Sequence, residues 1–340
     1  MELLAALLHK DARAGSVKKQ VAGALSVLSE HPTIKVAVAA AGCIEPLVGL
    51  LGIWSHPWSQ AAEALRALSF QNTDNQRLVS AHLVGLLVGG SIAAVDRSAA
   101  VLWRIVQDNP SHQKTIARAG GAAQLATLLR TGHDEAKEYA LWALSQCSDP
   151  TNQKEVASHD AIPLIVSRLS VKCVPVQEQA AAALAKLAFD DAELCGLIVK
   201  AGGIPPLVEL LDGSNVSGEA REQAAAALAE LAAPAAHREA MVAAGCIQAF
   251  SRCFDAAEGP LQHAATAVAR MAHEHTELQA QIAAADVIAP LIRLLSGDKG
   301  TDAQASAAHA LASLAGHQPN HAAILEAGDG IGPFVRRDHG

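Results

Sequence analysis

The sequence predicts an all-α solenoid of about seven three-helix repeats, with half-repeats at both ends. The same pattern returns at intervals of 38 to 43 residues along the 340-residue chain. Hydrophobic residues make up 51% of it but aromatic residues only 3%, so the apolar content is mainly Ala, Leu, Val and Ile. No sustained alternation of apolar and polar residues predicts strands. A tandem period of this length is typical of helical solenoids.

Each repeat is expected to contain a short first helix, a small-residue turn, a second helix and a longer third helix. The clearest second helix follows Ala201-Gly202-Gly203, and the third helix after it reads Glu222-Gln223-Ala224-Ala225-Ala226-Ala227-Leu228. First helices include 75–79 and 152–156. The predicted third helices are 17–29, 59–70, 97–107, 136–148, 177–188, 220–232, 261–272 and 303–315.

One residue marks the turn between the first and second helices of each repeat. The eight positions are Gly42, His82, Gly120, Asp160, Gly202, Gly245, Asp286 and Gly328. Glycine permits positive φ or a close approach of two backbones at such a turn, and Asp tolerates the same geometry. His82 fits this pattern least well.

Proline and leucine mark the two ends of the second helices. Pro46, Pro163, Pro206 and Pro290 follow the turns by three or four residues, where the first helical turn accepts proline. Leucine pairs close these helices at 50–51, 128–129, 210–211 and 294–295. Thr301 and Gln304 have the spacing of a capping box at the start of a third helix.

The whole chain, 1–340, is predicted to be one solenoid domain. It begins within a second helix at 2–8 and stops within another at 331–337. Solenoid ends usually carry polar capping repeats. A fragment of a longer product and a minimally capped array both agree with this pattern.

Charge and cysteine content limit the partners. The net charge of −8 argues against nucleic acid held through its phosphates and suits a mildly basic protein. The six cysteines form no CxxC pair, as expected for reduced thiols in the cytoplasm or the nucleus. Residues 1–8 lack the basic region of a signal peptide, and the uncharged stretch 83–95 is too short to span a bilayer. We therefore expect no direct membrane insertion.

No motif for catalysis stands out. The chain lacks GxSxG, a phosphate-binding GxxxxGK[ST] and a GxGxxG after a strand. The pairs His317/His321 and His273/His275 have no acidic or cysteine partners at zinc spacing. We expect no enzyme activity, no metal and no cofactor.

The turn, the Ala-Gly-Gly-Ile-Pro-Pro-Leu-Val-x-Leu-Leu second helix and the Ala-Leu-x-x-Leu-Ala third helix resemble the armadillo repeat family over essentially the whole chain. Among its members the chain looks most like vacuolar-protein-8, β-catenin-like and plant armadillo scaffolds. The resemblance implies a right-handed superhelix, whose third helices line a concave groove that holds extended peptides.

In the importin-α branch of that family, groove helices carry a Trp and, four residues later, an Asn. Here one copy keeps the aromatic, Trp142, with Gln146 in the Asn position. The asparagine ladder is absent, and no basic importin-β-binding segment occurs at the N-terminus. A nuclear transport adaptor is therefore the disfavoured alternative.

The expected function is a non-catalytic scaffold that binds an extended peptide or a partner helix along the groove. A mixed polar strip supplies the candidate contacts: Arg97, Arg104, Tyr139, Trp142, Gln146, Gln179, Lys186, Gln223, Glu230, His263 and Arg270. Such residues equally form the solvated face of an amphipathic helix. A further alternative is an architectural component of a cytoskeletal or membrane-contact assembly, with self-association through exposed ends.

Overall fold

A computed structural model describes residues 1–9, 15–53, 57–107, 115–116, 118–132, 134–145, 150–158, 160–213, 216–255, 260–296 and 300–329. Within these ranges every regular element is a helix and no strand occurs. The chain divides into two compact units, Met1–Leu164 and Ile165–Gly340.

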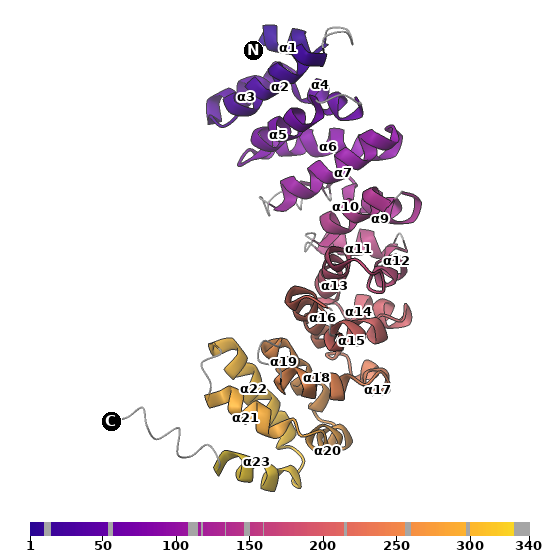
Figure 1. The fold of residues 1–340 in the computed structure, drawn as a ribbon, viewed down its shortest axis with the longest axis vertical. Helices are drawn as coiled ribbons and strands as arrows, with labels where there is room; N and C mark the ends of the chain where they lie inside the picture. The colour runs from indigo at the N-terminus through magenta and orange to yellow at the C-terminus, as the bar shows by residue number, and fades with distance from the viewer. Residues whose placement is uncertain are drawn as a thin grey trace, which may run out of the picture. The chain divides into compact units, whose positions relative to one another are not determined.

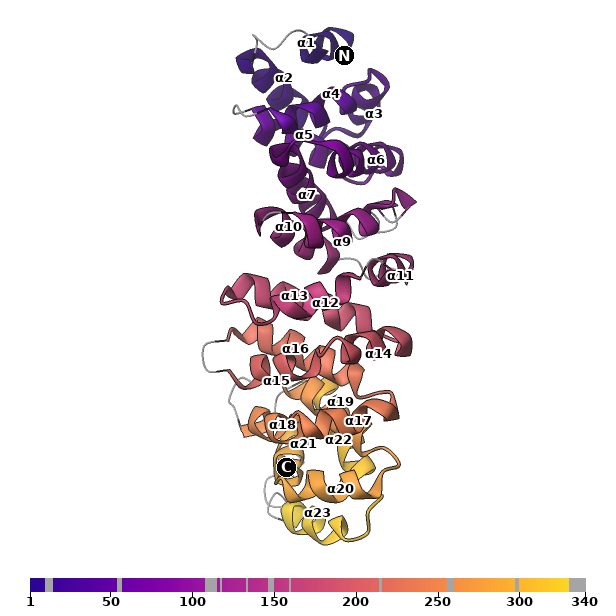
Figure 2. The same cartoon turned by 90° about the vertical axis from the view of Figure 1, so that its right-hand side faces the viewer.

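Successive third helices pack against each other in the first unit. In Figure 2, α2, α5 and α7 follow one another along one side of this unit, and the first helices α3 and α6 lie on the other. The helices, labelled in Figure 1, are α1 Glu2–His9, α2 Gly15–Leu28, α3 Pro32–Ala40, α4 Ile44–Gly49, η2 Leu50–Gly52, α5 Pro57–Ser69, α6 Thr73–Gly89, α7 Ile92–Gln107, α9 Gly121–Thr131, α10 Asp134–Ser145 and α11 Pro150–Ser158. The helix α12, Ala161–Arg168, contains the boundary between the units.

The second unit repeats this arrangement, with α13, α16, α19 and α22 packed in sequence. Its helices are α13 Val174–Ala188, α14 Ala192–Lys200, α15 Ile204–Asp212, α16 Gly218–Leu231, η3 Ala235–His237, α17 Arg238–Ala243, α18 Cys246–Asp255, α19 Leu261–Ala272, α20 Thr276–Ala284, α21 Ile288–Ser296, α22 Thr301–Leu314 and α23 Asn320–Asp329. All eight predicted third helices are present, although α7 begins earlier than expected, at Ile92.

Six of the eight predicted turn residues have positive φ. The values are 72° at Gly42, 71° at Gly120, 51° at Asp160, 77° at Gly202, 81° at Gly245 and 58° at Asp286. At three of these turns, those at Gly42, Gly202 and Asp286, the first and second helices meet at a bend of 83°. The left-handed residue therefore turns the chain sharply within the repeat.

The turn predicted at His82 is wrong. This residue lies inside α6, which continues from Thr73 to Gly89 and replaces a first and a second helix. A side chain with a Cβ disfavours the left-handed conformation, and Gly85, three residues later, lies inside the same helix. Gly328 likewise lies within α23. The half-repeat expected at 331–337 lies outside the described residues.

The proline and leucine signals are confirmed. Pro46, Pro163, Pro206 and Pro290 each occupy the third residue of a second helix. The leucine pairs that close these helices are buried, except for Leu295, which is 38% exposed. The capping box is wrong: Gly300 is the N-cap residue of α22, with no side-chain cap, and Gln304 Nε2 donates to the Leu295 carbonyl instead.

Buried amides connect consecutive repeats. Asn75 Nδ2 donates to two carbonyls of the preceding repeat, that of Leu68 near the end of its third helix and that of Lys35 in its first helix. Asn320 makes the equivalent bonds to the carbonyls of Leu314 and Gln279. Because both amides are almost fully buried, these bonds satisfy carbonyl groups that water cannot reach.

Candidate functional site

Three aromatic side chains form a cluster on two neighbouring third helices of the first unit. Trp103 comes from α7, and Tyr139 and Trp142 come from one turn of α10. The ring centroid of Trp142 lies 4.8 Å from that of Trp103 and 5.4 Å from that of Tyr139. All three side chains are half-buried. The chain has only four Trp and one Tyr, so this aromatic cluster gathers half of its tryptophans and its sole tyrosine.

The sequence prediction found Tyr139 and Trp142 but missed Trp103. In the repeat pattern of the third helices, Ala100 and Arg104 stand at the positions that correspond to Trp142 and Gln146. In the structure Trp103 is the residue that meets Trp142. Trp103 precedes Trp142 by 39 residues, one repeat period, and this spacing could have identified it. Gln146 lies outside the described residues.

Carboxylates surround the aromatic cluster. Burial raises the pKa of the Tyr139 hydroxyl, and the negative charges of Glu135, Glu138 and Asp96 raise it further. Tyr139 therefore remains a neutral hydrogen-bond donor at physiological pH. A cleft of about 350 Å³ lies beside it, lined in part by Trp58, Asp96 and Glu135. Aromatic faces next to carboxylates favour cationic groups, because both the ring quadrupole and the charge attract them.

Arg97 connects its third helix to the preceding repeat. Its Nη1 donates to the carbonyls of Leu51 at 2.8 Å and Ile53 at 2.6 Å. Its guanidinium also lies 5.1 Å from the ring centroid of Trp58. Trp58 belongs to the first turn of α5, and this contact places it between two repeats.

Arg104 and Arg270 make similar connections. Arg104 pairs with Glu63 of the preceding third helix at 2.7 Å, and Glu63 also pairs with Arg66 at 3.0 Å. Arg270 pairs with Glu230 at 3.0 Å and donates to the carbonyl of Ala229. Arg270 and Glu230, both members of the predicted polar strip, are therefore partners across consecutive third helices, and Arg104 has such a partner in Glu63, which is not a member.

The remaining candidates lie on α13, α16 and α19. His263 Nε2 lies 3.2 Å from a carboxylate oxygen of Glu222, and Gln223 donates to Glu219 within α16. Gln179 and Lys186 are half-buried on α13, and each interacts with another group. Among all the candidates, the aromatic cluster presents the broadest half-buried apolar surface, and such aromatic groups dominate binding energies at protein interfaces.

Across the described parts of the chain, no group of three or more His, Cys, Asp or Glu residues is arranged to hold a metal ion. In the same parts, no single helix is long and apolar enough to cross a membrane. Three bent helix pairs satisfy the same criteria of length and composition when taken together.

Comparisons with known proteins agree with this geometry. Residues 191–233 match the family described as Armadillo/beta-catenin-like repeat, and they hold the first, second and third helices α14, α15 and α16 of one repeat. A stretch of 90 residues is 33% identical to importin subunit alpha-1b of Oryza sativa subsp. japonica. It covers 26% of this chain and only 17% of that relative.

Two solved structures extend the similarity along the chain. An engineered protein of the Northeast Structural Genomics Consortium has a TM-score of 0.66 and 25% identity, over 96% of this chain and 92% of that chain. Computationally designed armadillo repeat proteins for modular peptide recognition have a TM-score of 0.62 and 24% identity, over 68% of this chain and 98% of theirs. The fold is thus an α-solenoid of armadillo type.

Proposed function

We propose that this protein is a non-catalytic scaffold that binds an extended peptide across its third helices, in the cytoplasm or the nucleus. The observation that carries the proposal is the aromatic cluster of Trp103, Tyr139 and Trp142. It offers half-buried ring surface on two adjacent third helices. Aromatic side chains of this kind supply large contact area at low entropic cost.

The proposed partner segment carries Lys or Arg side chains. The carboxylates of Asp96, Glu135 and Glu138 act on Tyr139 electrostatically, which supports a local negative potential at the cluster. The net charge of −8 adds a long-range attraction for such a segment. Arg97 and Arg104 do not offset this potential fully, because Arg104 is paired with Glu63 and the single charge of Arg97 faces three carboxylates.

The test compares the wild type with Trp103→Ala/Trp142→Ala on an array of basic, acidic and neutral peptides. Basic peptides should bind the wild type preferentially, and the double variant should bind them at least roughly 30-fold more weakly, since hot-spot truncations cost about 2 kcal/mol or more. Phe189→Ala is the matched control, because this aromatic is 65% exposed at the end of α13. Unchanged binding by the double variant would rule out the cluster as the anchor.

The similarity to importin subunit alpha-1b favours a nuclear transport adaptor as the second candidate. The Trp103–Trp142 contact supports it too, because it brings a second aromatic ring beside Trp142. Selective binding of a basic nuclear localisation peptide, together with capture of importin-β by the full chain, is the expected result. Binding of basic peptides without regard to their sequence would favour the general scaffold.

A further inference from the structure

A second cleft lies on the first and second helices of the second unit, not on its third helices. It occupies about 630 Å³ between α17 and α18 of one repeat and α20 and the following turn of the next. A neighbouring cleft of about 480 Å³ lies between η3–α17 and α20. Val242 and Gln281 line both, so the two form one continuous surface, here called the edge cleft.

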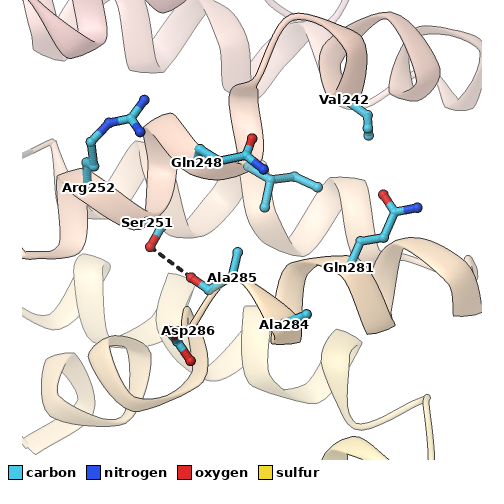
Figure 3. A pocket seen from close by; sticks show the side chains of 9 residues that line it. Val242, Gln248, Ser251, Arg252, Gln281, Ala284, Ala285 and Asp286 are labelled. Carbon is cyan, nitrogen blue, oxygen red and sulfur yellow. Dashed lines mark hydrogen bonds between the residues drawn. The ribbon is translucent and has the colours of Figure 1, made fainter.

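The edge cleft exists where the repeat departs from its own pattern. Six residues after the turn residue, the other described copies of the second helix carry buried apolar residues: Val48, Ala126, Val166, Val208 and Ile292. This copy carries Ser251, which is half-buried. Its hydroxyl donates to the carbonyl of Ala285 at 2.9 Å, as Figure 3 shows, and so lies against the next repeat. Val166 occupies the position of Ser251 in another repeat, and one of its methyl groups lies close to Gly203 of the repeat that follows. Serine lacks these branched methyl groups.

The edge cleft carries hydrogen-bonding groups above an apolar floor. Figure 3 shows the amides of Gln248 from α18 and Gln281 from α20, with Val242 from α17 nearby. Both glutamines are exposed, whereas Ile247, which also lines the cleft, is buried. Each amide has two donor hydrogens and one acceptor oxygen, the groups needed to pair with the N–H and C=O of an extended main chain.

The balance of charge at the edge cleft is negative. Glu239, Glu277 and Asp286 line it and are exposed. Of the two arginines that line it, Arg252 pairs through two nitrogens with Asp212. Arg238 is buried and donates to the neutral carbonyl of His273, so its charge offsets one of the three carboxylates. A cationic ligand is therefore better matched to the rim than an anionic one.

We propose that the edge cleft is a second peptide site, which takes an extended segment bearing Lys or Arg side chains. The amides of Gln248 and Gln281 pair with the main chain of that segment, and its basic side chains reach Glu239, Glu277 and Asp286. This site is independent of the aromatic cluster, so the protein can hold two segments of one partner or of two partners.

The test uses the full chain in a Trp103→Ala/Trp142→Ala background, which removes the aromatic cluster from the measurement. The probe is a fluorescein-labelled eight-residue peptide that alternates Lys and Ser, and its binding is followed by fluorescence anisotropy. Ser251→Val installs the residue that three other repeats carry, so the fold is expected to tolerate it. It should weaken binding by about tenfold or more, which corresponds to about 1.4 kcal/mol. Ser313→Val on α22, which does not line the cleft, should leave binding unchanged.

Gln248→Ala/Gln281→Ala changes exposed side chains only and should produce a similar loss, even if Ser251→Val proves unstable. An alternating Glu and Ser peptide should not bind, and spermine should not compete at equal charge, because it offers no main-chain amides. The proposal is overturned if the Lys peptide fails to bind in this background. It is also overturned if the glutamine variant binds as well as its parent, or if spermine competes as well as the peptide. If the edge-cleft proposal fails, the proposal for the aromatic cluster still stands, because that site is tested separately in the wild-type background.

Discussion

The Nη1 atom of Arg238 donates to the carbonyl oxygen of His273 at 2.8 Å, and so joins the first helix of a repeat to the end of the third helix of the same repeat. Lys35 makes the same connection, because its Nζ donates to the carbonyl of Phe70 at 2.6 Å, again 35 residues ahead. Both cations lie near the C-terminal end of a third helix, where the helix dipole favours positive charge. A basic side chain at this position thus holds the first and third helices of one repeat together.

Replacing Arg238 with Ala should lower the free energy of unfolding by about 1.5–3 kcal/mol, the usual range for a charge-assisted hydrogen bond. Arg238→Gln should cost less, because Gln76 and Gln279 occupy this position in other repeats and donate to the carbonyls of Ser69 and Ala272. Urea unfolding followed by circular dichroism measures both. Arg77→Ala, an exposed arginine on α6, is the control and should stay within about 0.5 kcal/mol of the wild type.

Glu63 should make stability depend on pH in the acidic range. Desolvation raises the pKa of Glu63, but the hydrogen bond from Arg66 and the charge of Arg104 outweigh it, and the pKa falls below its usual 4.5. The unfolded chain then binds the proton more tightly. The stabilisation is therefore complete above pH 4.5 and disappears as the pH falls through the lower, folded pKa.

Because the Glu63 side chain is 37% exposed, its ion pairs should contribute no more than about 1 kcal/mol. Glu63→Gln should lose this amount at pH 7 and match the wild type near pH 3. Chemical denaturation across this range, with the exposed Glu45→Gln as control, gives the comparison. A difference between Glu63→Gln and wild type that persists at pH 3 would show that packing, not charge, is responsible.

The buried cysteines should resist thiol reagents. Burial raises the pKa of Cys195 to about 11 and those of Cys246 and Cys253 to about 12, so almost no thiolate exists at pH 8. In the folded protein these three thiols should remain unmodified by dithionitrobenzoate, and in urea they should react fully. Peptide mapping by mass spectrometry identifies the sites. Rapid modification of Cys246 without urea would contradict the packing of α18.

Two glycines in consecutive elements should respond oppositely to alanine. A Cβ at Gly203 would lie 2.7 Å from Ile198 Cγ2 and 3.0 Å from the Ile198 carbonyl oxygen. Gly203→Ala should therefore cost about 1–3 kcal/mol, as overpacking usually does. Gly196 lies within α14 and a Cβ there would meet nothing within 4 Å. Gly196→Ala should stabilise the protein by up to about 1 kcal/mol. Thermal unfolding that moves in the same direction for both would refute the turn geometry.

Most of the fold could be predicted from the sequence, because the residues that determine each turn and helix start are close together in the chain. Positive φ at Gly202 and Asp286, and proline in the first turn of α15, depend on residues within a few positions of each other. The turn predicted at His82 was wrong because a continuous helix satisfies the same apolar pattern as two helices joined by a turn. Local signals of this kind say little about which surface is free to bind.

The candidate site was harder to predict because its contacts cross repeats. Whether Arg97 and Arg270 face a ligand or a neighbouring helix depends on carbonyl groups 41 to 46 residues away. Trp103 contacts Trp142 although it lies one helical turn after Ala100, the residue that the repeat pattern aligns with Trp142. The groove assigned to these polar residues remains a prediction, and the structure adds that several of them already have intramolecular partners.

The buried amides of Asn75 and Asn320 have a consequence for dissecting this chain. Each bonds to two carbonyl groups of the preceding repeat. A single period excised from the array would leave such an amide without either partner in a newly opened interior, and the lost bonds are costly there. The smallest fragment that folds on its own should therefore span two periods. Shortening the array should lower the free energy of unfolding in steps, one for each interface removed, rather than in proportion to its mass.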